Sequence, residues 1–182
     1  VYYGQTSKVY EGDWHLGHWH GKGTIQTSDG DYTGDVVNDL KEGSGLMVYA
    51  DGHKFEGTFK QDKPVEGTLT YVDQKQYVGQ LKNGKWHGKG TLSYPDGSKY
   101  TGEFHSGVQH GQGIYNFSDG SVYDGESVMG AYEGMGKMTW ADGGWYEGEW
   151  TQGEANGHGM EIRPDGRLRH HGKWRKGVPV RT

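Results

Sequence analysis

Histidines are the side chains whose chemistry must be considered first in this chain, because the sequence contains ten of them and no cysteine. Thiol catalysis, disulfides and cysteine-bound zinc are therefore excluded. The sequence has no Gly-x-Ser-x-Gly nucleophile motif, no Walker loop and no His-Glu-x-x-His metal motif. Its Gly-x-Gly pairs resemble phosphate loops, but they open strand-like segments rather than a helix whose N-terminus would hold a phosphate. We predict a protein that is not an enzyme and needs no cofactor.

The ten histidines raise the alternative of a metal site. His20, His87 and His110 each lie ten residues after a recurring aromatic residue. Such positions in consecutive repeats would lie about 10 Å apart, whereas two ligands of one zinc ion bring their nitrogens within roughly 4 Å. We interpret this position as packing or surface. The remaining candidates are His170 and His171, which a two-fold axis could bring together in two copies, but the prediction is that no metal is bound.

An internal repeat must position these side chains, and an aromatic residue marks it every 22 or 23 residues. Seven repeats fill residues 10–169 and begin at Tyr10, Tyr32, Phe55, Tyr77, Tyr100, Tyr123 and Tyr146. A glycine follows two residues later in every repeat, and a large apolar residue follows four residues later except at Ser127. Residues 1–9 are interpreted as the tail of a preceding repeat. His170, 24 residues after Tyr146, opens a half repeat over residues 170–182.

Each repeat has the period-2 alternation of β-strands. Tyr100, Gly102 and Phe104 would share one face of a strand, and Thr101 and Glu103 the other. Closing Asp-Gly pairs, and Asn-Gly or Ser-Gly pairs between the two runs, predict hairpins. Since glycine has no Cβ, we expect a ring of an adjacent strand to lie flat over it. The predicted repeat core consists of Tyr10, Trp14, Tyr32, Phe55, Phe59, Tyr77, Tyr100, Phe104, Tyr123, Tyr146 and Trp150.

The sequence therefore predicts an all-β fold, an elongated single-layer antiparallel sheet of stacked hairpins with a rise of roughly 10 Å per repeat. Only 31% of the residues are hydrophobic and 35 are glycine, which is too little aliphatic material for a thick two-layer core. Two repeats are irregular. The third has Val65 in place of the first glycine of its pair and Asp73-Gln74 in place of Asp-Gly, and the sixth has Ser127. We interpret these departures as tolerated drift, with partner docking as the alternative.

The motif Tyr-x-Gly-x-Phe/Trp-x-x-Gly-x-x-x-Gly-x-Gly, closed by Asp-Gly, resembles the MORN repeat (membrane occupation and recognition nexus) over residues 10–177. The resemblance implies a solenoid-like rod of stacked hairpins and a non-catalytic role as a scaffold, dimeriser or membrane-adjacent adaptor. A chain made almost wholly of such repeats is most similar to the cytoskeletal scaffold proteins of protozoan parasites. That resemblance implies a cytoplasmic protein, associated with the cytoskeleton or a membrane.

Charge is unevenly distributed along the chain. Residues 163–182 carry a net charge of +6 and the remainder carries −11. The acidic bulk disfavours nucleic acid as a partner. Weak contact with an anionic membrane would depend on Arg167, Arg169, Lys173, Arg175 and Lys176. The sequence has no apolar run long enough for a membrane span and no signal-peptide pattern, and it begins inside a repeat without Met, so we expect a piece of a longer protein.

The half repeat predicts how the chain assembles. The last repeat stops after one strand, so we expect Trp174 to have no following strand to cover it. Two copies related by a two-fold axis would close this end, and the expected contact residues are Tyr146, Trp150, His170, Trp174 and Val178.

The functional prediction is a structural scaffold of a cytoskeletal or membrane-adjacent assembly that forms homodimers and binds other cytoskeletal proteins. Two alternatives stay open. One is an adaptor that binds a partner peptide along its aromatic face. The other is a phosphoinositide-binding module that uses the basic C-terminal end.

Overall fold

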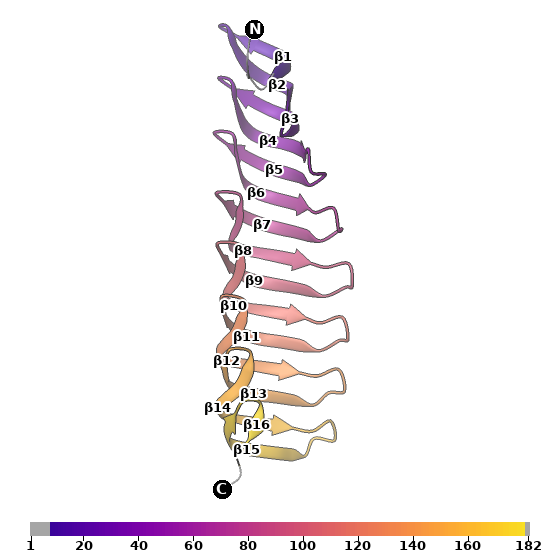
Figure 1. The fold of residues 1–182 in the computed structure, drawn as a ribbon, viewed down its shortest axis with the longest axis vertical. Coiled ribbons are helices and arrows are strands. Elements are labelled where there is room, and N and C mark those ends of the chain that lie inside the picture. Colours follow the sequence, from indigo (N-terminus) through magenta and orange to yellow (C-terminus); the bar gives the residue numbers. More distant parts are fainter. Residues whose placement is uncertain (1–7, 181–182) are drawn as a thin grey trace, which may run out of the picture. The chain divides into compact units, whose positions relative to one another are not determined.

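The computed structural model describes residues 8–180, and their regular structure consists of β-strands (Figure 1). Residues 8–180 include no helix that is long and apolar enough to cross a membrane. Contacts divide the chain into two compact units, which separate after Lys85. The N-terminal unit contains β1 (Val9–His15), β2 (His18–Thr27), β3 (Gly30–Val37), β4 (Leu40–Tyr49), β5 (Lys54–Lys60), β6 (Lys63–Thr70) and β7 (Gln76–Lys82).

The remaining strands belong to the C-terminal unit, apart from Lys85, the first residue of β8. They are β8 (Lys85–Ser93), β9 (Lys99–His105), β10 (Val108–Asn116), β11 (Val122–Val128), β12 (Ala131–Thr139), β13 (Trp145–Thr151), β14 (Glu154–Ile162), β15 (Leu168–Arg175) and β16 (Val178–Pro179). In each unit every strand pairs antiparallel with the next strand of the chain. Each unit is an open antiparallel sheet of consecutive hairpins, which confirms the predicted all-β fold class.

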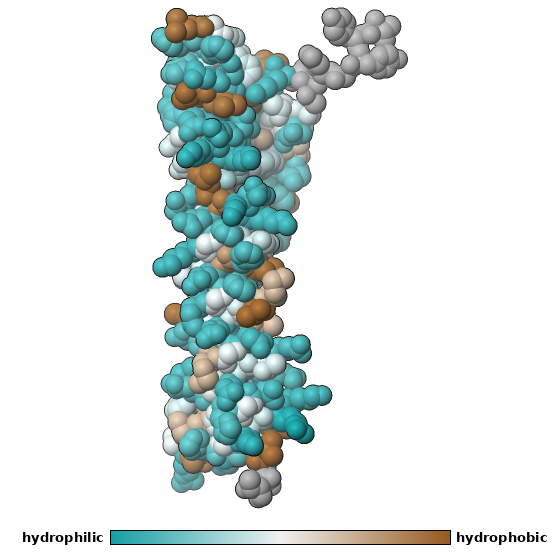
Figure 2. Space-filling view, turned by 90° about the vertical axis from the view of Figure 1, so that its left-hand side faces the viewer, coloured by the Kyte–Doolittle hydropathy of each residue, from teal (hydrophilic) through white to brown (hydrophobic). Residues whose placement is uncertain are grey.

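Alternation of side chains decides which face of a strand is buried. In β9, Tyr100 and Phe104 are 1% and 3% exposed, whereas Thr101 and Glu103 between them are exposed. A strand that alternates in this way has one face for packing and one for solvent. On the surface that Figure 2 shows, hydrophobic residues are scattered among hydrophilic ones.

Two kinds of turn join the strands, and both need left-handed backbone conformations. At one end most tips are an X-Gly pair, as at Ser106 and Gly107 with φ angles of 52° and 89°, and two tips are Asn38-Asp39 and Gln61-Asp62. At the other end the aspartate of Asp-Gly accepts a hydrogen bond from the amide two residues later, at 2.9 Å between Asp96 Oδ1 and the Ser98 nitrogen. These are the local bonds that make Asx residues favourable in turns.

A row of glycines crosses the middle of the strands in each unit. A Cβ atom added to Gly102 would lie 2.5 Å from the Gly113 Cα atom and 2.6 Å from the Tyr100 hydroxyl oxygen. Backbone and ring therefore approach too closely for any side chain on this face. The paired glycines are Gly12, Gly23, Gly34, Gly45, Gly57, Gly67 and Gly79 in one unit, and Gly90, Gly102, Gly113, Gly125, Gly136, Gly148, Gly159 and Gly172 in the other.

The core is a row of rings on the face that these glycines line. The ring of Tyr100 covers both Gly102 in its own strand and Gly113 in the next strand. The opening rings from Tyr32 onward are at most 2% exposed: Tyr32, Phe55, Tyr77, Tyr100, Tyr123 and Tyr146. Phe59 and Phe104 are 2% and 3% exposed beside them.

The first repeat departs from this pattern. Trp14 is 60% exposed, although we expected it in the core. Tyr10 is half-buried and stacks on Trp19 with 4.6 Å between the ring centroids. Within residues 8–180, β1 pairs on one side only, with β2, so its rings have neighbours on a single flank.

The two irregular repeats keep the fold by local adjustments. In the third repeat Gln74 adopts the left-handed φ of 68° that the glycine of Asp-Gly would supply. Most hairpins have a β-bulge, where the strand register shifts, and the missing glycine makes this bulge shorter in the third repeat. Thr58 therefore has a pairing partner in β6. In the sixth repeat the ring of Tyr132 stacks on Tyr123 at 3.6 Å and lies opposite Ser127, which is 1% exposed. The chain itself therefore accommodates both departures.

Candidate interaction surfaces

A hydrogen bond from the opening tyrosine, here called the tyrosine clasp, closes most hairpins. The hydroxyl donates to the carbonyl oxygen three residues later, at 2.7 Å from Tyr32 to Asp35 and at 3.2 Å from Tyr100 to Glu103. That carbonyl belongs to a β-bulge, because the register to the next strand skips Asp35 and Glu103. Burial raises the pKa of Tyr32 and of Tyr100 to about 12, so both hydroxyls remain donors at neutral pH. The same bond forms at Tyr10, Tyr77, Tyr123 and Tyr146.

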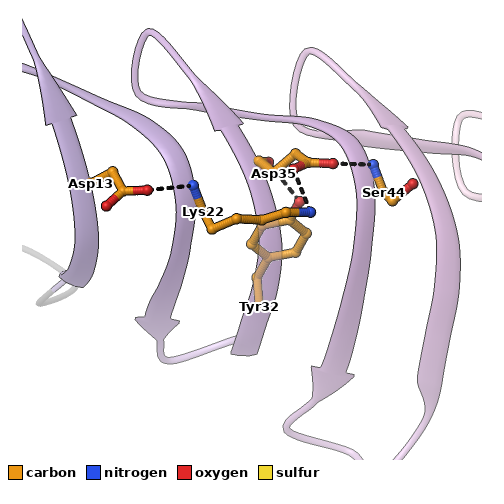
Figure 3. A network of polar contacts seen from close by, with 5 residues as sticks. All are labelled: Asp13, Lys22, Tyr32, Asp35 and Ser44. Carbon is orange, nitrogen blue, oxygen red and sulfur yellow. Dashed lines mark hydrogen bonds and ion pairs between the residues drawn. The ribbon is translucent and has the colours of Figure 1, made fainter.

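The side chain of the clasped residue completes the bulge on the opposite face (Figure 3). Asp35 Oδ2 accepts a hydrogen bond from the Ser44 amide at 2.9 Å, and Lys22 Nζ lies 2.5 Å from Asp35 Oδ1. Gly43 precedes that amide with a φ of 67°, and a Cβ atom there would lie 2.9 Å from Asp35 Oδ2. The hydrogen bond from Lys22 is the main reason that the pKa of Asp35 lies below its ordinary value. Five repeats have an acid at this position: Asp13, Asp35, Glu103, Glu126 and Glu149.

A groove of about 720 Å³ lies on this polar face of the N-terminal unit, above the glycine row. Its floor consists of Gly23, Gly34, Gly45 and Gly57, one from each of β2 to β5. In a strand, the residues before and after a glycine have their side chains on the face opposite to the glycine's missing Cβ. The side chains that form the walls of this groove therefore lie on the face opposite to the rings. The walls are Lys22, Thr24, Thr33, Ser44, Leu46, Glu56 and Thr58.

This groove offers contact surface and hydroxyl groups. The Thr24 and Thr33 hydroxyl oxygens lie 3.3 Å apart, and Leu46 is 39% exposed. Strand pairing already occupies the amides and carbonyls of the floor. Four strands spaced about 4.8 Å apart give a floor roughly 14 Å long, which matches about four residues of an extended chain. The geometry suits an extended segment that lies across the strands.

The C-terminal unit repeats this arrangement on a smaller scale. A groove of about 470 Å³ lies above Gly90 and Gly102. The Thr91 and Thr101 hydroxyl oxygens face each other there at 3.2 Å. Cross-strand threonines beside the glycine row are thus a feature of both units.

The structure buries three of the five residues that we expect at a dimer contact. Tyr146, Trp150 and Trp174 are 2%, 8% and 5% exposed. Trp174 packs against Tyr146 with 4.9 Å between the ring centroids, and its indole N–H donates to the Gly159 carbonyl oxygen at 3.1 Å. Because β16 pairs with β15 at Trp174, the expectation that no following strand covers this ring is wrong. Val178 is 60% exposed.

Histidine rings in these repeats make structural contacts. His170 Nε2 lies 3.1 Å from the Lys173 carbonyl oxygen, so this imidazole replaces the hydroxyl of the tyrosine clasp. His105 lies between His87 and His110, with ring centroids 5.3 Å and 5.7 Å apart. In the part of the chain that the structure describes, no group of three or more histidine or carboxylate side chains could hold a metal ion.

The basic residues expected to contact anionic lipid differ in their surroundings. Arg169 Nη1 lies 2.6 Å from Glu161 Oε1, and Arg167 Nε lies 3.7 Å from Asp165 Oδ2. Two of the five cations therefore face a carboxylate, which lowers the positive charge available to a membrane.

The family model for the MORN repeat matches seven consecutive segments of the chain: residues 10–31, 32–54, 55–76, 77–99, 100–122, 123–145 and 146–166. The chain belongs to the MORN repeat family. Each matched segment begins at the aromatic residue that opens a repeat. Membership of this family suggests a protein-interaction or membrane-associated scaffold.

Solved structures resemble this MORN protein at low sequence identity. The TCP domain of SAS-4 (dCPAP) from Drosophila melanogaster, in complex with a proline-rich motif of Ana2 (dSTIL), is 13% identical, with a TM-score of 0.55. That alignment covers 92% of this chain and 90% of the TCP domain. A mutant TCP10 domain of Danio rerio CPAP is 14% identical over 84% of this chain and 72% of its own, with a TM-score of 0.33. No curated protein matches the sequence.

Proposed function

We propose that this MORN protein is a non-enzymatic scaffold whose N-terminal unit holds an extended peptide of a partner protein in the glycine-floored groove. The observation that carries the proposal is the 720 Å³ groove, whose backbone floor lets a ligand approach the sheet closely. The sequence suggests a peptide along the aromatic face as an alternative. The opening rings of that face are almost fully buried from Tyr32 onward, so they offer a peptide little contact surface. The polar face is the open one.

The ligand of the similar TCP domain supports an extended peptide as the partner. That domain was solved with a proline-rich motif. Proline-rich segments are extended, with about 3.1 Å per residue, and make no internal hydrogen bonds. Such a segment needs few backbone partners, which suits a floor whose own amides and carbonyls are paired. In this proposal the partner belongs to a cytoskeletal or membrane-adjacent assembly.

A blocked groove tests the proposal. Peptides would be selected from a displayed random library on the wild-type protein, and their dissociation constants measured by calorimetry. Thr33→Trp places an indole in the N-terminal groove and should weaken binding at least tenfold. Thr101→Trp makes the same change in the smaller groove and should leave the affinity unchanged. If the peptides bind both variants with the affinity of the wild type, the proposed site is refuted. If only Thr101→Trp loses binding, the peptide site lies in the C-terminal unit instead.

A further inference from the structure

One carboxylate occupies a position that is apolar in the preceding repeats. In the second strand of each hairpin, the residue that pairs with the opening ring is Ile25, Met47, Leu69, Leu92, Tyr115 or Met138. In β14 that residue is Glu161, which pairs with Tyr146 on one side and His170 on the other. Glu161 is 7% exposed. A carboxylate buried at such a site destabilises the fold unless a partner compensates it.

An inserted residue supplies the partner. Glu161 pairs with His170 and Ile162 pairs with Leu168, so Arg169 is the extra residue of a bulge in β15. The step from Tyr146 to His170 is 24 residues because of this insertion. Arg169 Nη1 donates to Glu161 Oε1 at 2.6 Å. Two departures from the repeat thus meet in one ion pair, and such departures are typical of functional positions.

A hollow of about 260 Å³ opens beside this pair in the C-terminal unit. Glu161, Arg169 and the rings of Trp140, Trp150 and Trp174 line it. The indole N–H groups of Trp150 and Trp174 donate to backbone carbonyls at 2.9 Å and 3.1 Å, so these two residues offer a ligand their ring surface alone. Trp140 is 37% exposed. Indole rings beside a carboxylate form a favourable environment for a cation.

The charges around the hollow also favour a cation. An adjoining hollow of about 370 Å³ shares Glu161 and Arg169 and adds Asp142 and Arg163, while Glu154 lines the first hollow. Three carboxylates therefore face two guanidinium groups, which leaves a net charge of −1. Of residues 8–180, only Arg169 bonds the Glu161 carboxylate, so Glu161 Oε2 lacks a protein donor.

We propose that this hollow binds the side chain of an arginine or lysine of a partner protein. The cation donates a hydrogen bond to Glu161 Oε2 and packs against the Trp140 ring. Arg169 holds Glu161 Oε1 and is a positioning residue for the carboxylate. The site lies in the C-terminal unit and is independent of the peptide groove, so either proposal can fail without the other.

The test uses small probes on the full chain. N-acetyl-arginine amide, N-acetyl-lysine amide and the neutral isostere N-acetyl-citrulline amide would be titrated while NMR follows the Trp140 indole N–H and the Glu161 amide. We expect saturable shifts with a cationic probe and none with citrulline. Glu161→Gln and Trp140→Ala should each weaken that binding at least tenfold. Glu147→Gln, which removes a carboxylate from the opposite face of β13, should leave it unchanged.

Three results would overturn the proposal. Citrulline could shift the signals as arginine does, or Glu147→Gln could weaken binding as much as Glu161→Gln. Inorganic phosphate could produce the same saturable shifts, which would show that Arg169 binds anions instead. If circular dichroism shows that Glu161→Gln does not fold, Trp140→Ala decides the test, because its partly exposed ring can be removed with less effect on packing.

Discussion

At the scale of single residues, the tyrosine that opens a repeat fills the core with its ring and closes the bulge with its hydroxyl. The third repeat has Phe55 at this position, and its bulge is shorter, so Thr58 is already paired with Glu66. The six full repeats that open with tyrosine each have one residue more between the position four residues after the tyrosine and the next paired glycine. The residue type at the opening position therefore follows the length of the bulge beside it.

This relation predicts different results for two reciprocal substitutions. Tyr100→Phe removes the donor to Glu103 and should lower the free energy of unfolding by about 1 kcal/mol. Phe55→Tyr adds a buried hydroxyl beside the shorter bulge, where we expect no clasp to form, and should give no gain in stability. Denaturant unfolding of both variants measures the difference. A gain from Phe55→Tyr equal to the loss from Tyr100→Phe would contradict the relation.

Buried tyrosines also predict the response to alkaline pH. Burial is the main cause that raises the pKa of Tyr32, Tyr100, Tyr132 and Tyr146 to about 12, above the ordinary value of about 10. Their folded-state pKa is raised, so the stability they contribute is complete below about pH 10 and is lost as the pH rises towards 12. Melting temperatures should fall steeply over that interval. The melting temperature of Tyr100→Phe should fall less steeply with pH. A fall equal to that of the wild type would show that ionisation of Tyr100 does not contribute.

At this scale the sequence predicted the buried rings from Tyr32 onward, misplaced Trp14 and missed the partners of the rings. Alternation places Tyr100 and Phe104 on one face, because period 2 is a property of the strand itself. The acid that completes each bulge recurs three residues after the opening aromatic, as at Asp35 and Glu103, and this spacing was visible in the sequence. The role of this acid was not visible, because the extra residues of a bulge change the strand register and have no sequence pattern of their own.

At the scale of elements, the hairpin tips have left-handed backbone conformations that some of the residues there do not favour. Met129 adopts a φ of 52° and is 71% exposed, and Leu16 adopts a φ of 49° and is 87% exposed. Asn38 adopts the same conformation, φ 49°, with a side chain suited to it. The turn type is therefore imposed by the hairpin rather than by the residue at its tip.

Replacement at these tips tests that conclusion. Met129→Asn should raise the free energy of unfolding by about 1 kcal/mol, because asparagine tolerates the left-handed region better. Asn38→Met is the matched control and should lower it by a similar amount. Thermal melts of both variants measure the effect. A destabilised Met129→Asn would show that the methionine makes a contact that its exposure conceals.

Element positions were largely predictable, and the surfaces were not. Asp-Gly and X-Gly pairs locate most of the turns, and the repeat predicts the strands between them. The position of each groove depends on which face of the glycine row is left uncovered. The rings cover one face, and their placement is known only from the three-dimensional structure. Glu161 and Arg169 escaped notice for a similar reason, since only the bulge in β15 brings them together.

At the scale of the whole molecule, self-association stays a prediction, with a smaller contact than the sequence suggested. The structure buries Tyr146, Trp150 and Trp174 within the chain, so Val178 and His170 are the expected residues left for a two-fold contact. Sedimentation of the wild type at micromolar concentration should show a dimer, and Val178→Asp should show a monomer. Val128→Asp, at a site that is 44% exposed in another hairpin, is the control. A dimer that survives Val178→Asp would place the contact elsewhere.

The bulge also determines how this chain tolerates changes in length. The third repeat has one residue fewer between its core ring at Phe59 and Gly67 than the fifth has between Phe104 and Gly113, yet both glycines keep their place in the row. Deletion of Gly111 would give the fifth repeat the spacing of the third, and we expect a folded protein by circular dichroism. Deletion of Thr101 removes a residue from the regular part of the strand, which reverses the faces of the residues after it, and should unfold the hairpin. Codon losses and gains can therefore accumulate at one point of each repeat while every other residue keeps its neighbours.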